Sequence, residues 1–366
     1  SEKQLYHIIG MKKGDTYNQK KILEIDKRIG KTNYLSQKKK HEFVFHKNTV
    51  DIYFYLEKEK NNFIDGLIGF SNQDNKIKIN GFAKIKLQNL INKGEEVYIN
   101  WNGDQKKFQK LESIINFPYL GHSKIGAKGE LNVYKQNNDF TNILTETGIF
   151  YHINHKSIIG INYQNKNSIV ENENFSTSKE NNIGLEFKFH RSNSQYINLN
   201  GYFGKRKHVT LWNGNNHNSN HYSCNINSHD IKKINSHIRI SLSTNSSLIF
   251  SDDLSVNELL LFGGSNSLTG FNENQFLANK YAITTASFYY ILEENTAFSL
   301  FYQQAYFQKK IINQDITSGW PRSIGARIDL ENKSSIVYIQ YAIGISKDQN
   351  FSFQNGKIHL GVQNRF

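Results

Sequence analysis

Two short segments of this sequence place glycine with serine or lysine in patterns that enzymes and nucleotide-binding proteins use. Gly263-Gly264-Ser265-Asn266-Ser267 is similar to a nucleophile elbow, but the closing glycine is absent and no helical pattern follows. Residues 121–128 are similar to a phosphate-binding loop, but the lysine is misplaced and the segment alternates as a strand does. We therefore expect no catalytic residue in either segment, and the sequence does not predict an enzyme.

The histidine, cysteine and acidic side chains show no spacing that would hold a metal. The 13 histidines are scattered without an HExxH pattern, and the single cysteine, Cys224, can form no disulfide within the chain. Acidic pairs such as Asp252-Asp253 stand in segments of turn composition, where solvated carboxylates are expected. We therefore expect no metal and no other cofactor. The net charge of +13 is spread over strands and loops, which argues against a nucleic-acid partner.

The composition limits the class of protein, and so the kind of secondary structure, that could position any site. The chain has 366 residues, of which 37% are hydrophobic and 13% aromatic, and its mean hydropathy is −0.61. No window approaches the roughly 18 apolar residues of a membrane-spanning helix. Two prolines and one cysteine exclude collagen-like and disulfide-rich classes, and 25 phenylalanines are too many for a disordered chain. A transmembrane β-barrel combines these properties, because only every second residue faces lipid.

From residue 61 to the C-terminus, apolar and polar residues alternate in strand after strand. In one such strand, Ile183 and Leu185 alternate with Glu186 and Lys188. A large soluble β-protein would also alternate, but the persistence of the pattern and the charges on its polar face favour a hydrated lumen. At roughly 18–20 residues for a strand with its turn, this length predicts a transmembrane antiparallel β-barrel of about 16 strands.

The first 60 residues differ from the rest and predict a small α+β domain. Isoleucines at helical spacing predict a helix over residues 18–29, and alternation predicts strands over 41–46 and 50–58. The lysine run at 38–40 is expected to be a solvated connection. The polar first residues begin no secretory signal, so we expect a mature or trimmed chain. The predicted domains are residues 1–60 and 61–366.

Residues 260–271, Leu-Leu-Phe-Gly-Gly-Ser-Asn-Ser-Leu-Thr-Gly-Phe, resemble the loop motif of the BamA/TamA superfamily of outer-membrane insertases and translocases. The resemblance implies that this segment is the sixth external loop of a 16-stranded barrel and folds back into the lumen. Residues 1–60 resemble a POTRA domain, the periplasmic unit that precedes such barrels. The loop-motif residues are Gly263, Gly264, Ser265, Asn266, Ser267, Leu268, Thr269, Gly270 and Phe271.

The sequence departs from the family pattern at one loop position and one wall position. The resemblance implies an arginine where Thr269 stands, paired with an aspartate of the thirteenth strand where Gln303 stands. Alternation places Gln303 on the inner face with Phe301 and Ala305. Loss of both charges together is coherent, because one unpaired buried charge would cost roughly 3–5 kcal/mol. Thr269 and Gln303 are expected either to share a hydrogen bond of about 1 kcal/mol or no longer to touch.

The resemblance also implies a lateral gate where the first barrel strand meets the last. Glycines in both strands pack poorly, and an opened seam would offer unpaired N–H and C=O groups to a client strand. Inward lysines such as Lys86 and Lys188 predict anion preference if the lumen conducts. The predicted gate residues are Phe63, Ile64, Gly66, Ile68, Gly69, Phe70, Ile358, Leu360, Gly361 and Phe366.

The predicted function is assembly or translocation of proteins at the outer membrane of a Gram-negative cell, with residues 1–60 in the periplasm. The expected partners are outer-membrane lipid and lipopolysaccharide, unfolded or nascent outer-membrane or secreted proteins, and accessory periplasmic or lipoprotein subunits. Two other functions stay open. One is a structural scaffold subunit of a larger outer-membrane complex, and the other is a two-partner secretion pore that exports one large polypeptide through its lumen.

Overall fold

The structure is a computed structural model of the 366-residue chain, and it divides into two compact units, Ser1–Asn167 and Ser168–Phe366. The predicted boundary at residue 60 lies inside the first unit. The residues that the structure describes are 2–30, 32, 34–59, 62–73, 76–104, 108–121, 123–136, 139–171, 176–192, 194–210, 216–251, 254–265, 267–293, 295–312, 314–331 and 335–364.

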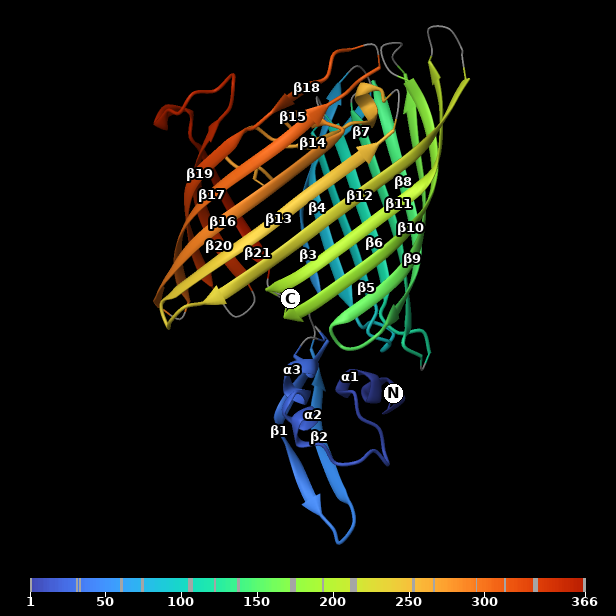
Figure 1. The fold of residues 1–366 in the computed structure, drawn as a ribbon, viewed down its shortest axis with the longest axis vertical. Coiled ribbons are helices and arrows are strands. Elements are labelled where there is room, and N and C mark those ends of the chain that lie inside the picture. The colour runs from blue at the N-terminus through green and yellow to red at the C-terminus, as the bar shows by residue number, and fades with distance from the viewer. Residues whose placement is uncertain are drawn as a thin grey trace. The chain divides into compact units, whose positions relative to one another are not determined.

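The N-terminal part of the first unit consists of three short helices and a two-stranded antiparallel sheet (Figure 1). Ile22, Ile25 and Ile29 are buried in one core together with α1 and with one face of the sheet, which explains the helical spacing of these isoleucines. The elements are α1 (Glu2–Ile9), α2 (Gln19–Leu23), α3 (Ile25–Ile29), β1 (Leu35–Phe45) and β2 (Val50–Lys58).

Several local expectations for this part were wrong. The helix predicted over 18–29 is interrupted at Glu24, which ends α2 and begins α3, and its carboxylate pairs with Arg28 at 2.9 Å. The lysines at 38–40 are not a connection but lie on β1, where register shifts against β2 leave all three exposed. The helix α1 was not predicted at all. A POTRA domain is not evident in the described residues of this part.

The rest of the first unit is a run of antiparallel strands, each paired with the strand before it. Between β3 and β8 the pairing proceeds without a crossover, and β9 begins in this unit. The strands are β3 (Phe63–Gln73), β4 (Lys76–Gln88), β5 (Glu96–Asp104), β6 (Phe108–Phe117), β7 (Ile125–Gln136), β8 (Phe140–His152) and β9 (Ser157–Val170).

The second unit continues the same antiparallel pattern. Both β18 and β19 pair with β17, and the interruption between them contains Pro321, which has no N–H to donate to a neighbouring strand. The strands are β10 (Ser176–Ser192), β11 (Gln195–Thr210), β12 (Asn216–Lys233), β13 (Ile238–Phe250), β16 (Lys280–Glu293), β17 (Thr296–Lys309), β18 (Thr317–Gly319), β19 (Arg322–Glu331), β20 (Ser335–Ile345) and β21 (Lys357–Asn364).

These seventeen described strands belong to one large antiparallel sheet, which matches the wall of a β-barrel. Because β18 and β19 occupy a single place beside β17, the strands define sixteen wall positions, seven in the first run and nine in the second. The predictions of a mainly β chain and of about 16 antiparallel strands are confirmed. By this count β13 is the eleventh wall strand, β16 the twelfth and β17 the thirteenth.

The wall strands carry polar side chains on the buried face and apolar side chains on the exposed face. On β10, Glu180, Asn182 and Glu186 are at most 1% exposed, whereas Ile183 and Leu185 are 61% and 64% exposed. This arrangement is the reverse of a soluble β-sheet, in which the apolar face is buried. The alternation predicted from the sequence is therefore present, with the polar side chains inside.

The segment between the eleventh and twelfth wall strands is the longest connection of the second unit. It contains the 3₁₀ helix η1 (Val256–Glu258) and a two-stranded hairpin of β14 (Leu260–Phe262) with β15 (Phe276–Ala278). We call residues 251–279 the inner loop. A second 3₁₀ helix, η2 (Phe353–Asn355), lies between β20 and β21. Among the residues that the structure describes, none of the helices has both the length and the apolar character needed to cross a membrane.

Candidate functional site

The tip of the inner loop, of which residues 263–265 and 267–271 are described, packs against the inner face of β16 and β17. The contact is an apolar cluster. Leu268 and Phe271 are 0% and 1% exposed, and they share this cluster with Phe262 of β14 and with Ala305 of β17. The ring of Phe262 also stacks on Phe276, the residue opposite it in the hairpin, at 5.0 Å between centroids. The loop is therefore folded onto the inner face of the wall rather than extended away from it.

Glycine is required at the tip because the backbone there turns tightly and approaches the wall. Gly263, Gly264 and Gly270 have φ angles of +115°, +93° and +82°, which other residues rarely adopt. A Cβ atom on Gly270 would overlap the backbone of Gly344 on β20. Asn266 of the predicted motif lies outside the described residues.

Thr269 and Gln303 are in contact, so the loop and the wall touch where the sequence left the question open. The backbone N–H and the hydroxyl of Thr269 both donate to Oε1 of Gln303, at 2.8 and 2.6 Å. The Gln303 amide in turn donates to the Ser267 carbonyl and to Oγ1 of Thr285, each at 3.0 Å. Both Thr269 and Gln303 are buried. Neutral groups therefore hold the tip to the thirteenth wall strand.

Ser265 fixes the tip through hydrogen bonds within the inner loop. Its N–H and its hydroxyl both donate to Oε1 of Glu273, at 2.7 Å each. The hydroxyl of Ser267 accepts from the N–H of Gly263 at 2.7 Å. The serines of the glycine–serine segment thus act as backbone-fixing groups.

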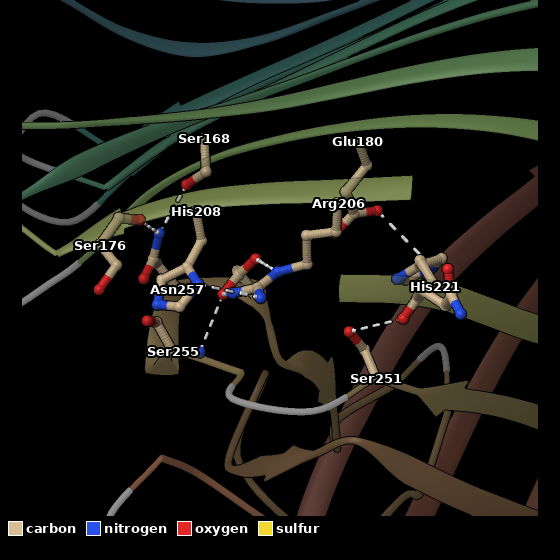
Figure 2. A network of polar contacts seen from close by, with 11 residues as sticks. Ser168, Ser176, Glu180, Arg206, His208, His221, Ser251, Ser255 and Asn257 are labelled. Carbon is tan, nitrogen blue, oxygen red and sulfur yellow. Dashed lines mark hydrogen bonds and ion pairs between the residues drawn. The ribbon is translucent and has the colours of Figure 1, made fainter. Parts of the chain in front are cut away.

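A charged contact that was not predicted from the sequence holds residues 254–259 of the inner loop. We call these residues the limb. Arg206 of β11 donates from Nε and Nη2 to the two carboxylate oxygens of Glu258 on η1, at 2.6 and 2.5 Å. Both side chains are 0% exposed. The N–H of Ser255 donates to the same carboxylate at 2.9 Å, and Nδ1 of His208 lies 3.4 Å from Nη1 of Arg206. Figure 2 shows Arg206 with His208 and Ser255 around this contact.

Asn257 adds a second polar attachment of the limb. Its amide donates to the Ser168 hydroxyl at 2.6 Å and to the Ser176 carbonyl at 3.0 Å, so it connects the limb to β9 and β10 (Figure 2). Two signals for the limb could have been read from the sequence. Ser255 and Glu258 have capping-box spacing, and alternation places Arg206 on a polar face. Nothing in the sequence, however, indicates that the two segments meet.

Several inward charges along the described wall form ion pairs. Lys188 pairs with Glu186 on β10, and Nζ of Lys86 lies 3.4 Å from Glu96. Other described pairs are Lys128 with Glu146, His221 with Glu180 and Arg327 with Asp329. The prediction of anion preference counted lysines but not the carboxylates that alternation also turns inward. These pairs remove the basis of that prediction for Lys86 and Lys188.

Hydroxyl groups line a cavity beside the tip in the second unit. The cavity has a volume of about 470 Å³. Its lining includes hydroxyls of the loop (Ser265, Ser267, Thr269) and of the wall (Thr285, Ser287, Ser299). Such a surface can exchange hydrogen bonds with water or with a polypeptide backbone, because each hydroxyl both donates and accepts. No group of three or more His, Cys, Asp or Glu that could hold a metal occurs among the described residues.

The predicted gate residues lie on β3 in the first unit and β21 in the second. Ile64, Ile358 and Leu360 are exposed at 74%, 69% and 73%, as apolar outward residues should be. Gly66, Ile68, Gly69 and Phe70 lie in the β3–β4 register with Phe63, and Gly361 stands opposite Tyr338 of β20. Phe366 lies outside the described residues. The gate itself stays a prediction.

Comparison with known proteins gives a fold but no closer relationship. No protein-family model matches the chain, and no curated protein matches its sequence. Among solved structures, BamA from Haemophilus ducreyi lacking POTRA domains 1–3 aligns over 100% of this chain and 81% of its own, with a TM-score of 0.53 and 12% identity.

Two further solved structures are similar. CdiB from Acinetobacter baumannii aligns over 94% of this chain and 68% of its own, with a TM-score of 0.58 and 12% identity. CdiB from Escherichia coli aligns over 99% of this chain and 73% of its own, with a TM-score of 0.59 and 11% identity. This chain therefore has a fold like that of the BamA and CdiB barrels, as the loop motif had implied.

Proposed function

We propose that this chain, which has a fold like that of the BamA and CdiB barrels, is an outer-membrane protein that inserts or translocates other proteins. The observation that carries the proposal is the contact between Thr269 and Gln303. It puts a loop that resembles the insertase motif on the inner face of the thirteenth wall strand, where the resemblance implies it should be. The role needs no chemical step, no metal and no nucleic acid.

The outward face of the wall supports residence in a membrane. Large apolar side chains such as Leu185, Leu242 and Leu300 are at least half exposed on successive parts of the second unit. Removing one such side chain from water is worth roughly 1.5–3 kcal/mol, so a wall with dozens of them favours lipid over water. A polar inner face and an apolar outer face are the pattern of outer-membrane barrels. The N-terminal part, residues 1–60, would then lie in the periplasm.

The proposed mechanism uses β3 and β21, the two strands of the lateral gate that the resemblance implies. An open seam would leave unpaired N–H and C=O groups on the two strands, and these can add a client strand by hydrogen bonding. Gly66 and Gly69 of β3 offer little side-chain packing, which would favour opening at this strand. The clients would be unfolded outer-membrane or secreted proteins, with accessory periplasmic or lipoprotein subunits as further partners.

Cysteine crosslinking tests this proposal. In a Cys224→Ser background, Ile64→Cys on β3 and Leu360→Cys on β21 would be oxidised in the presence of an arrested outer-membrane precursor that carries cysteines along its last strand. Leu242→Cys on β13 is the matched control, because it is also apolar and exposed but far from either terminal strand in the sheet order. We expect disulfide adducts at the two seam positions and none at the control. If a folded barrel gives no seam adduct, the insertase function is rejected and a scaffold role is favoured.

The hydroxyl-lined cavity favours a second candidate, a pore that passes one secreted polypeptide through its lumen. The serine and threonine hydroxyls of its lining, which also includes Arg239, Arg327 and Asp329, can exchange hydrogen bonds with an extended backbone. Single-channel recording separates this function from the first. A secretion pore should conduct in discrete steps that rise when the inner loop is displaced, whereas conductance unaffected by the loop would argue against it.

A further inference from the structure

We infer that Arg206 and Glu258 form the charged anchor that positions the inner loop, and that the neutral Thr269–Gln303 contact fixes only its tip. The inference rests on the proposed function and adds to it, because it identifies what holds the inner loop against the wall. The charge pair that the motif lacks at Thr269 and Gln303 is thus present elsewhere with reversed polarity. The arginine is on the wall and the carboxylate is on the loop.

The geometry of the anchor uses both oxygens of the Glu258 carboxylate as acceptors. One oxygen of Glu258 accepts from Nε of Arg206, and the other accepts from Nη2 and from the N–H of Ser255. Two parallel bonds between a guanidinium and a carboxylate fix orientation as well as distance. Because both side chains are fully buried, separating them would leave two unpaired charges out of water, which is strongly unfavourable.

The limb around the anchor has a core of its own. Leu254 and Leu259 pack with Ile249 of β13 and with Ile311, in a cluster distinct from the one that buries the tip. The amide of Asn257 attaches the same limb to β9 and β10. The limb therefore keeps its position through contacts that do not involve the tip.

The returning end of the inner loop is fixed at Asn279. Its N–H donates to the Gln308 carbonyl at 2.9 Å, and its carbonyl accepts from the N–H of Ile249 at 2.7 Å. Its side-chain oxygen accepts from the N–H of Lys310 at 3.0 Å. With both ends attached to the wall, the part that can change position is the hairpin and tip between them.

The polar contacts of the tip are easier to replace than those of the limb. All of the hydrogen bonds around Gln303 join neutral groups, and the adjoining cavity holds hydroxyls that could take their place. A neutral hydrogen bond contributes less than a charge-assisted one. Burial of Leu268 and Phe271 also holds the tip, but apolar burial is not directional. The anchor of fixed geometry is therefore Arg206 with Glu258.

Thiol labelling of the full chain tests this assignment. In a Cys224→Ser background, Leu254→Cys reports on the limb and Leu268→Cys on the tip, since both side chains are at most 2% exposed. Glu258→Gln removes the anchor's charge, and Thr269→Val removes the tip hydroxyl, each with little change of shape. A maleimide reagent would be added to the folded protein in detergent, without any client.

We expect Glu258→Gln to raise labelling at both reporters by at least about tenfold, because lost charge-assisted bonds increase the open population. Thr269→Val should raise labelling at the tip only, by less than about threefold. Each single reversal, Arg206→Glu or Glu258→Arg, should raise the labelling of the limb. The double variant that carries both should show less labelling than either single variant. General loosening of the barrel would not give this recovery.

The assignment is overturned if Glu258→Gln leaves the limb reporter unlabelled in a folded barrel, or if Thr269→Val releases limb and tip equally. Gel mobility with and without heating checks that each variant is folded. Because no client takes part, failure here leaves the crosslinking test of the proposed function untouched, and failure of crosslinking leaves this labelling result standing.

Discussion

Gly270 of the inner loop and Gly344 of β20 face each other so closely that a Cβ atom on either would overlap the backbone of the other. Gly270 also has a φ of +82°. This close approach of the two backbones explains why the motif carries glycine directly after Thr269.

We expect Gly270→Ala to destabilise the protein by about 2–4 kcal/mol, because left-handed strain adds to the overlap with β20. Gly121→Ala is the matched control. Gly121 has a φ of +61°, but nothing lies within 4 Å of the added Cβ, so it should cost only the conformational part, about 1 kcal/mol. Denaturant unfolding in detergent measures both. Equal losses would contradict the close approach.

The neutral tip contact can be converted into a charged one. Thr269→Arg alone would bury an unpaired charge beside Gln303 and should cost roughly 3–5 kcal/mol. Adding Gln303→Asp should recover most of that loss, because the two side chains already meet. A double-mutant cycle on unfolding free energies gives the coupling. A coupling near zero would mean that position 269 does not reach position 303 in solution.

The buried pair of Arg206 and Glu258 predicts strongly non-additive substitutions. Arg206→Met leaves Glu258 buried without its partner, and we expect a loss of about 3–5 kcal/mol. Arg206→Met combined with Glu258→Met should be near neutral, because no charge then remains to be desolvated. Arg327→Met, at a pair that is partly exposed, is the comparison and should cost less, about 1 kcal/mol. Additive losses at Arg206 and Glu258 would contradict a buried pair.

Tyr34 in the N-terminal part predicts a dependence on alkaline pH. Burial raises the pKa of the Tyr34 phenol well above its ordinary value, and Tyr119 and Glu95 add to the rise. The unfolded chain ionises this group near pH 10. Stability from Tyr34 is therefore present below pH 10 and is lost as pH rises toward the folded pKa.

Removing the hydroxyl should abolish this pH dependence. The Tyr34 hydroxyl has no hydrogen-bond partner among the described residues, so Tyr34→Phe should be neutral or up to about 1 kcal/mol more stable at pH 8. Its advantage over the parent should grow at pH 11. Tyr17→Phe, at an exposed tyrosine, should change neither value. Unfolding curves at the two pH values test this prediction. If the difference in unfolding free energy between Tyr34→Phe and the parent is the same at both pH values, that result would argue against a buried phenol.

Charge on the outward face tests whether that face meets lipid. Leu185 of β10 and Leu23 of α2 are similarly exposed, at 64% and 69%. In a bilayer, Leu185→Arg should cost about 2–4 kcal/mol, whereas Leu23→Arg should stay within about 0.5 kcal/mol. Folding yields into lipid vesicles compare the two. If Leu185→Arg were as harmless as Leu23→Arg, the wall would not be a membrane surface.

The sequence predicted features that depend on local period and on the residue types at one motif. Two-residue alternation fixed which side chains of β10 and β17 point inward, and it placed Gln303 on the face that receives Thr269. The length of residues 61–366 predicted about sixteen strands, because strand length varies little when each strand must cross a layer of similar thickness. Local periodicity was a poorer guide at Glu24, where the structure has the two helices α2 and α3 in place of the one that was predicted.

By itself, then, the sequence determined the mainly β fold and the inward and outward faces, since both follow from spacing along a single strand. The position of the inner loop was implied by the resemblance of its motif. Only the tertiary structure decided that Arg206 and Glu258, 52 residues apart, form a buried pair, and that Lys86, Lys128 and Lys188 have carboxylate partners. Such contacts depend on the register of neighbouring strands and on the path of a long loop, and neither quantity is encoded in local periodicity.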